Sequence, residues 1–180
     1  MAINIFTVDA FTDRPFAGNP AAVCLLEHDS PSPDARWMQA IATEMNLSET
    51  AFLRRGRGDQ TFLLRWFTPV VEVPLCGHAT LASAHLLYEE GIVPGDQPAE
   101  FETLSGRLSA QKTSAGIEMD FPLQPVASIA DAHVPDALRK GLGVPLVEVA
   151  ADENRYVVEL CDAETLRNLQ PNLALLATLG

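Results

Sequence analysis

Basic residues are scarce in this 180-residue chain, because 12 Lys and Arg stand against 24 Asp and Glu and give a net charge of −12. Proteins that bind nucleic acid need a basic surface, and this chain has no basic excess from which to build one. An anionic membrane surface would repel it for the same reason. We therefore expect neither a nucleic-acid nor a membrane partner.

Cysteine is also scarce, and the odd number of three does not make a disulfide framework. The first nine residues lack a basic segment, and their apolar run is broken by Asn4, Thr7 and Asp9, which is unlike a secretory signal. No apolar run approaches the roughly 18 residues of a membrane-spanning helix. These absences predict a cytoplasmic protein.

Several motifs of well-known chemistry are missing, namely the phosphate-binding loop, the dinucleotide fingerprint, HExxH and GxSxG. Their absence argues against nucleotide, zinc-protease and serine-hydrolase functions, and we expect no cofactor. The spacing of Cys76, His78 and His85 matches no usual zinc pattern, so we expect no metal. His85 lies in an apolar helical pattern and is predicted to be a hydrogen-bonded core histidine.

What the chain does contain is an ordinary globular composition, 47% apolar and 20% charged. Its length suits one large domain or two small ones. Ser32, Pro33 and Asp34 predict a helix start, and the spacing of Trp37 to Met45 predicts its buried stripe. Short β-branched and apolar runs predict strands at 3–9, 21–26, 51–54, 62–67, 101–103, 107–112 and 117–121.

A second helix is predicted after Pro74, ending before Gly91. No fixed charge occurs between Ala79 and Leu87, so this helix should be buried nearly all round. Residues 122–135 are rich in Pro and Ala and are predicted to link two domains. Beyond them we expect a helix at 136–142, strands at 147–150 and 156–160, and a helix at 162–169, before an apolar end at 173–180.

The densest chemical cluster is Cys76-Gly77-His78, a thiol and an imidazole in the first turn of the second helix. Free backbone N–H groups and the positive end of the helix dipole could bind a carboxylate there. The same field would lower the pKa of Cys76 or His78. The alternative is a buried cysteine beside a helix-start glycine, with His78 hydrogen-bonded to a backbone carbonyl.

Two further positions carry both a functional and a structural interpretation. Glu49 lies between Ser48 and Thr50 where the first helix meets a strand, and a partly desolvated carboxyl group there could act as a general acid or base. It could equally be a solvated loop glutamate. The amide of Asn19, between Gly18 and Pro20, could contact a ligand, or these residues could form a plain turn.

Taken together, these segments resemble the PhzF-like phenazine-biosynthesis isomerase family over essentially the whole chain. The motifs that carry the resemblance occur in the family's order and spacing: residues 9–12, 18–23, 45–50, 67–69 with Glu72, and 75–79, followed by 101–106 and 156–160. The resemblance implies an α+β, diaminopimelate-epimerase-like fold with two similar domains. Each domain would be a curved mixed sheet wrapped around a central helix, with the active site in the cleft between them.

The resemblance also implies where the domains lie. The first would span 1–122, with residues 77–87 as its central helix, and 123–180 would hold a linker and an incomplete second domain. The family's loop of the type acidic-Pro-x-Thr-Gly-Ser has no match after Cys161. We therefore expect a fragment or a shortened protein, and an apolar end that pairs with another chain, most simply in a homodimer.

The family's chemistry is cofactor-free isomerisation, in which a proton leaves one carbon and another is delivered elsewhere on the substrate. The substrate of the phenazine enzyme is a dihydro-hydroxyanthranilate, a small cyclic carboxylic acid. By resemblance, Glu49 is the general acid/base and His78 the active-site histidine. Asn19, Gly77 and Cys76 fall on the substrate side of the cleft.

Two rival functions remain open at this point. Cys76 would be a thiol base in a racemase or epimerase of an amino acid, but such enzymes need a second facing cysteine, and no motif surrounds Cys24 or Cys161. The shortened chain could also be a non-catalytic ligand-binding or interaction protein.

Overall fold

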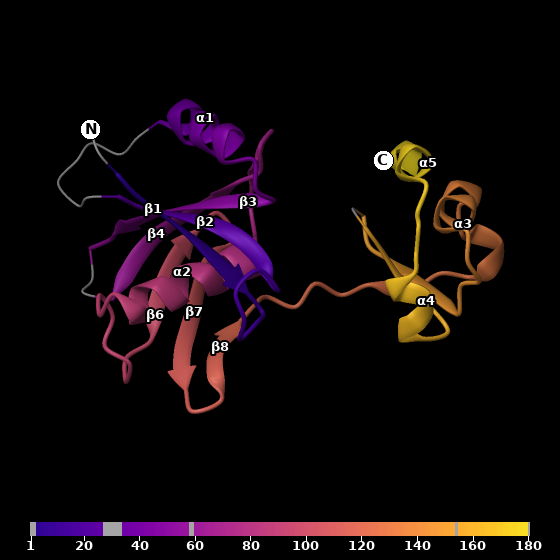
Figure 1. Cartoon of the computed structure of the whole chain (residues 1–180). Helices are drawn as coiled ribbons and strands as arrows, with labels where there is room; N and C mark the ends of the chain where they lie inside the picture. The colour runs from indigo at the N-terminus through magenta and orange to yellow at the C-terminus, as the bar shows by residue number, and fades with distance from the viewer. Residues whose placement is uncertain (1–2, 27–33, 58–59, 154, 180) are drawn as a thin grey trace. The chain divides into compact units, whose positions relative to one another are not determined.

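The computed structural model describes residues 3–26, 34–57, 60–153 and 155–179. The chain divides into two compact units, Met1–Phe121 and Pro122–Gly180 (Figure 1). Ser32 and Pro33, predicted to start the first helix, lie outside the described residues. No helix within the described ranges is long and apolar enough to cross a membrane.

The first unit contains an eight-stranded mixed sheet and two helices. In chain order its elements are β1 (Asn4–Ala10), β2 (Asn19–Leu26), α1 (Ala35–Met45), β3 (Glu49–Arg55), β4 (Thr61–Phe67), β5 (Glu72–Val73), α2 (Gly77–Glu89), β6 (Ala99–Thr103), β7 (Gly106–Thr113) and β8 (Gly116–Asp120). The strands run in the order β1-β2-β3-β4-β6-β7-β8, with β5 paired to β4. β2–β3 and β4–β6 are parallel, and the other pairs are antiparallel.

Helix α2 is the core of this unit, as the absence of fixed charge predicts. It contacts strands at both ends of the sheet order, β1 and β2 on one side and β7 and β8 on the other. A sheet can reach a helix from both of its ends only by curling around it (Figure 1). The contact is close because Ala79, Ala82 and Ala84 are fully buried and hold the strands near the helix axis. The α+β fold with a curved mixed sheet around a central helix is thus confirmed.

One stripe of α2 is not covered, and it carries His85. This residue is exposed and lines a hollow of about 410 Å³ whose other walls include Val8 of β1 and Ile117 of β8. The prediction of a core histidine is wrong because β1 and β8 form the two ends of the strand order and leave this stripe between them.

Helix α1 packs on the outer face of the same sheet. Its N-cap is Asp34, whose side chain accepts a hydrogen bond from the Trp37 N–H, and it ends at Asn46 in the left-handed conformation. Met38 and Ala42 are buried against a cluster that includes Cys24 of β2 and Phe52 of β3. The stripe predicted for this helix is confirmed. Only the three residues 46–48 separate α1 from β3, so Glu49 is held where that strand begins.

Strand β2 begins earlier than its apolar run suggests. Asn19 pairs with Ala10 of β1, and Pro20 pairs with Asp9, so the interpretation of these two residues as a turn is wrong. A proline near the first position of a strand costs little, because few ladder bonds need its missing N–H. Gly18 precedes them, and a Cβ there would lie 2.3 Å from the Ala10 carbonyl oxygen. This close approach requires glycine and holds Asn19 beside β1.

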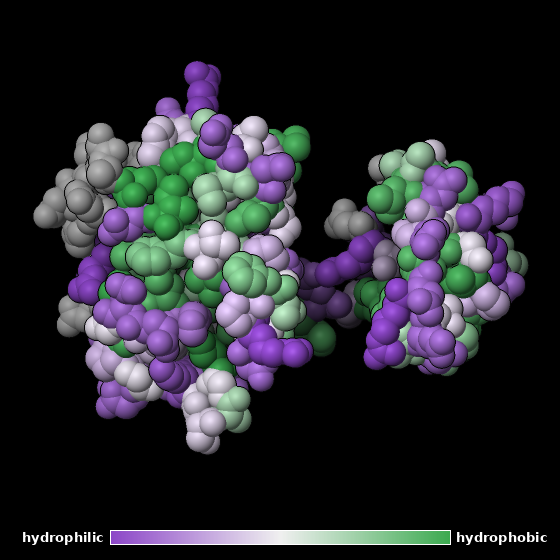
Figure 2. All heavy atoms as spheres, viewed as in Figure 1, coloured by the Kyte–Doolittle hydropathy of each residue, from purple (hydrophilic) through white to green (hydrophobic). Residues whose placement is uncertain are grey.

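The second unit has its own small core of Val134, Leu138 and Val149. Its elements are β9 (Ala127–Ser128), a 3-10 turn (Asp131–His133), α3 (Asp136–Leu142), β10 (Glu148–Ala151), β11 (Tyr156–Glu159), α4 (Ala163–Arg167), α5 (Leu173–Leu176) and a second 3-10 turn (Ala177–Leu179). The strands form one sheet in the order β11-β10-β9. The segment predicted as a linker is therefore partly folded. Figure 2 shows hydrophilic and hydrophobic residues interspersed on the visible face of each unit.

Candidate functional site

Three segments far apart in the sequence bring their polar side chains to one place in the first unit. They are the start of β2 with Asn19, the start of β3 with Ser48 and Glu49, and the start of α2 with residues 76–78. Because β2 and β3 are parallel with Ala21 opposite Glu49, both strands begin at the same end of the sheet. Side chains alternate along a strand, so Glu49 shares the face of Ala51 and Leu53, which pack in the core with α2.

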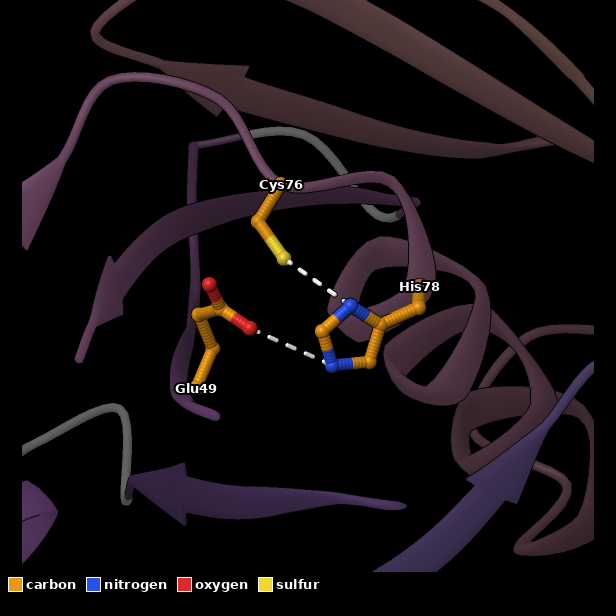
Figure 3. Close-up of side chains that lie close together, drawn as sticks. All are labelled: Glu49, Cys76 and His78. Carbon is orange, nitrogen blue, oxygen red and sulfur yellow. Dashed lines mark hydrogen bonds and ion pairs between the residues drawn. The ribbon is translucent and has the colours of Figure 1, made fainter. Parts of the chain in front are cut away.

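The centre of the site is the imidazole of His78, which lies between a carboxylate and a thiol (Figure 3). Its Nε2 is 3.3 Å from Oε2 of Glu49, and its Nδ1 is 3.4 Å from Sγ of Cys76. The side chains of His78 and Glu49 are 10% and 20% exposed, and Cys76 is buried. The structure thus brings Glu49, Cys76 and His78 together, and the interpretation of Glu49 as a solvated loop residue is wrong.

Asn19 and Ser48 extend this network on its exposed side. The Ser48 hydroxyl donates to Oδ1 of Asn19 at 3.4 Å and lies 3.5 Å from Nε2 of His78. Ser48 was not among the residues predicted for the site. Its only sequence signal is the hydroxyl next to Glu49, and serines of this kind are common in loops.

Gly77 opens helix α2 and faces free space. A Cβ built on it would have its nearest neighbour, the Phe121 ring, at 4.0 Å. Cys76 is the N-cap residue and its thiol, among the described side chains, makes no capping hydrogen bond. The first N–H groups of a helix have no partner within the helix. The site therefore offers backbone donors and the positive end of a helix dipole beside the Glu49–His78 pair.

The thiol of Cys76 is neutral in this setting. Burial raises its pKa to about 12, and the Glu49 carboxylate adds to the rise, whereas the N–H groups of Ala79 and His78 lower it by less. The prediction of a lowered pKa for Cys76 is wrong because loss of solvation outweighs the field of the helix N-terminus. A thiolate base at this position would therefore be costly to form.

The three donors Glu49, Cys76 and His78 lie within 4.8 Å of one another, a spacing at which a metal could be considered. However, the thiol and the carboxylate face different ring nitrogens of His78 (Figure 3). This is the pattern of a hydrogen-bonded relay, since ligands of one ion would converge on a single point. His85 does not belong to this group of described residues.

Comparison with known proteins first defines the class of fold. A hydroxyproline epimerase from Agrobacterium vitis superposes with a TM-score of 0.52 at 13% identity, covering 92% of this chain and 53% of that one. Its likeness concerns the fold alone and marks the α+β epimerase-like class. The family model described as phenazine biosynthesis-like protein matches residues 8–179. The chain belongs to this family, as its motifs predict.

Two closer relatives agree with this assignment. The chain is 46% identical over 176 residues to an uncharacterized isomerase of Halalkalibacterium halodurans, covering 98% of this chain and 64% of that protein. The crystal structure of a PhzF family protein from Enterococcus faecalis has a TM-score of 0.85 at 36% identity, covering 100% of this chain and 65% of that one. The chain therefore spans less than two thirds of the length of each of these relatives.

The pKa of about 12 for Cys76 and for Cys24 predicts selective alkylation. Only a thiolate reacts, so at pH 8 each buried thiol should react about 10³-fold more slowly than an ordinary thiol of pKa near 8.5. Iodoacetamide followed by peptide mass spectrometry should label exposed Cys161 and spare both others. All three should be labelled in urea. Labelling of Cys76 at the rate of Cys161 in the folded chain would contradict the neutral-thiol assignment.

Proposed function

We propose that the chain is part of a PhzF-like isomerase that moves a proton on a small, cyclic carboxylic acid by general acid/base catalysis. Glu49 is the proton-transfer group, and His78 is its hydrogen-bonding partner. The proposal rests on one observation above all, the buried contact of 3.3 Å between Oε2 of Glu49 and Nε2 of His78. Relatives that are named isomerases support the type of reaction.

The Glu49–His78 pair is chemically suited to this role because it can gain or lose a proton without a cofactor. A carboxylate can take a proton from carbon, and an imidazole in contact with it can share or return that proton. The reaction also needs no bond to the protein, since the proton leaves one carbon and is delivered to another. Cofactor-free catalysis is therefore part of the proposal.

The start of α2 is proposed to bind the substrate carboxylate. Gly77 has no side chain, and a Cβ built there would have its nearest neighbour, the Phe121 ring, at 4.0 Å. An anion at a helix N-terminus is favoured by the dipole. A carboxylate held there would bring the ring that carries it beside Glu49. Asn19, linked to His78 through Ser48, would line the same space.

The rival thiol racemase is less well supported. Its thiol base would be Cys76, whose pKa is raised to about 12. Within the first unit a second facing thiol is also lacking among the described residues, because Cys24 packs with Met38 of α1 on the outer face of the sheet. The homodimer and the cytoplasmic location stay predictions.

Glu49→Gln tests the proton-transfer role, since the amide keeps the size of the side chain and cannot titrate. We expect the exchange of substrate hydrogen with deuterated solvent, measured by NMR on a dihydro-hydroxyanthranilate, to fall by about 10²-fold or more. Glu44→Gln on the exposed side of α1 is the matched control and should keep the full rate. Unchanged exchange in the folded Glu49→Gln variant would show that Glu49 is not the base. Absence of exchange in the unmodified isomerase of which the chain is part would favour the non-catalytic alternative.

Gly77→Ala tests the carboxylate site separately from the chemistry. The added methyl group meets no close neighbour, so the free energy of unfolding should stay equal or rise by up to about 1 kcal/mol. It would, however, occupy the proposed carboxylate space and weaken binding of aromatic hydroxyanthranilate by about tenfold, through loss of a charge-assisted hydrogen bond.

Calorimetry and urea unfolding measure these two effects of Gly77→Ala. Gly95→Ala is the matched control, because this glycine follows the opposite end of α2 and also has free space for a Cβ. Equal affinity of both variants for the acid would place the carboxylate elsewhere.

A further inference from the structure

The two nitrogens of the His78 ring have different kinds of partner. Nδ1 faces only the Cys76 thiol among the contacts of the described residues, at 3.4 Å. Nε2 faces two oxygens, Oε2 of Glu49 at 3.3 Å and Oγ of Ser48 at 3.5 Å. A neutral imidazole carries one N–H and one lone pair, so these partners decide which nitrogen holds the proton.

The partners of Nε2 both act as acceptors. An ionised carboxylate can only accept hydrogen bonds. The Ser48 hydroxyl gives its hydrogen to Oδ1 of Asn19 and so turns a lone pair towards the ring. Two acceptors around Nε2 call for a proton on that nitrogen, which leaves Nδ1 with its lone pair towards Cys76.

The partner of Nδ1, the Cys76 thiol, also favours a proton on Nε2. A thiol that keeps its hydrogen is a weak donor, and burial, the charge of the Glu49 carboxylate and hydrogen bonding to that carboxylate keep Cys76 in this form. The carboxylate and Nδ1 are thus the two acceptors near the thiol, and a carboxylate that already accepts from Nε2 leaves the thiol hydrogen to Nδ1. A protonated Nδ1 would instead point its N–H at the S–H group, which is a weak acceptor. The same ring would then turn a lone pair towards the carboxylate of Glu49.

We propose that Cys76 is a positioning residue whose S–H donates to Nδ1 of His78 and thereby holds the imidazole proton on Nε2, facing Glu49. Its consequence for catalysis rests on the proposed function. With the proton on Nε2, Glu49 accepts a hydrogen bond and starts the reaction as a carboxylate, ready to take a substrate proton. Cys76 thus acts through His78 and does not exchange protons with substrate.

Every charged or titratable group facing the ring in the described part of the first unit is consistent with this assignment. Glu49 comes from β3 and Cys76 from the N-cap of α2. The ring itself lies in the first turn of α2. A proton on Nε2 and a lone pair on Nδ1 suit both partners of the ring.

The direct test is ¹⁵N NMR of the histidine rings in the 180-residue chain, with His78 assigned through a His78→Gln variant. We expect Nδ1 to give the signal of a lone-pair nitrogen and Nε2 that of a protonated one. In Cys76→Ala the ratio of the two tautomers should fall by about threefold to tenfold, the equilibrium effect of one neutral hydrogen bond. Cys76→Ser keeps a donor and should restore the ratio. Cys24→Ala, which removes a buried thiol on the other sheet face, should leave it unchanged.

Several outcomes would overturn the proposal. A proton on Nδ1 in the unmodified chain, or the same tautomer ratio in folded Cys76→Ala, would show that the thiol does not set the tautomer. Because the NMR measurement needs no substrate, it stays decisive even if Glu49 does not catalyse exchange. Where exchange is seen, Cys76→Ala should slow it by less than about tenfold, with recovery in Cys76→Ser. A loss of about 10³-fold or more would make Cys76 itself a proton carrier.

Discussion

Helix α2 can lie inside a curled sheet because it carries no fixed charge between Ala79 and Leu87 and presents small side chains to the strands. The rest of the first unit depends on this packing. A charged group here would lose its solvation, and a larger side chain would push the strands away from the helix. By curling around α2, the sheet brings the start of β3 to the first turn of the helix, and Glu49 meets His78 there. The geometry of the site therefore follows from the packing of the core.

The same burial decides the chemistry of the site. It keeps the Cys76 thiol neutral and removes most of the water around Glu49 and His78. Together these effects favour a carboxylate–imidazole pair over a thiolate as the proton-transfer group. The first turn of α2, where Gly77 leaves open space, brings backbone N–H groups next to that pair. The proposed substrate, a small carboxylic acid, needs this combination, because its anion would be bound and its C–H deprotonated by neighbouring groups.

Much of this fold can be predicted from the sequence, whereas the site can be predicted only in part. Strands such as β3 and β4, and the burial of α2, follow from local patterns of apolar residues. The contact between Glu49 and His78 does not follow from local patterns, because it depends on the parallel register of β2 and β3 and on the curl of the sheet. Only the family resemblance indicated it. His85 was placed wrongly because an apolar helix does not reveal which stripe the sheet leaves open. Ser48 was missed because its role depends on Asn19, which lies 29 residues away.

The central claim is that Glu49 and His78 form a proton-transfer pair beside a carboxylate site at the start of α2. A crystal structure of the protein with aromatic hydroxyanthranilate bound tests this most directly. We expect a carboxylate oxygen within hydrogen-bonding distance of the Gly77 or His78 backbone N–H, and the ring of the acid in contact with the Glu49 carboxylate. An acid bound away from the first turn of α2, or Glu49 turned away from both His78 and the ring, would contradict the account.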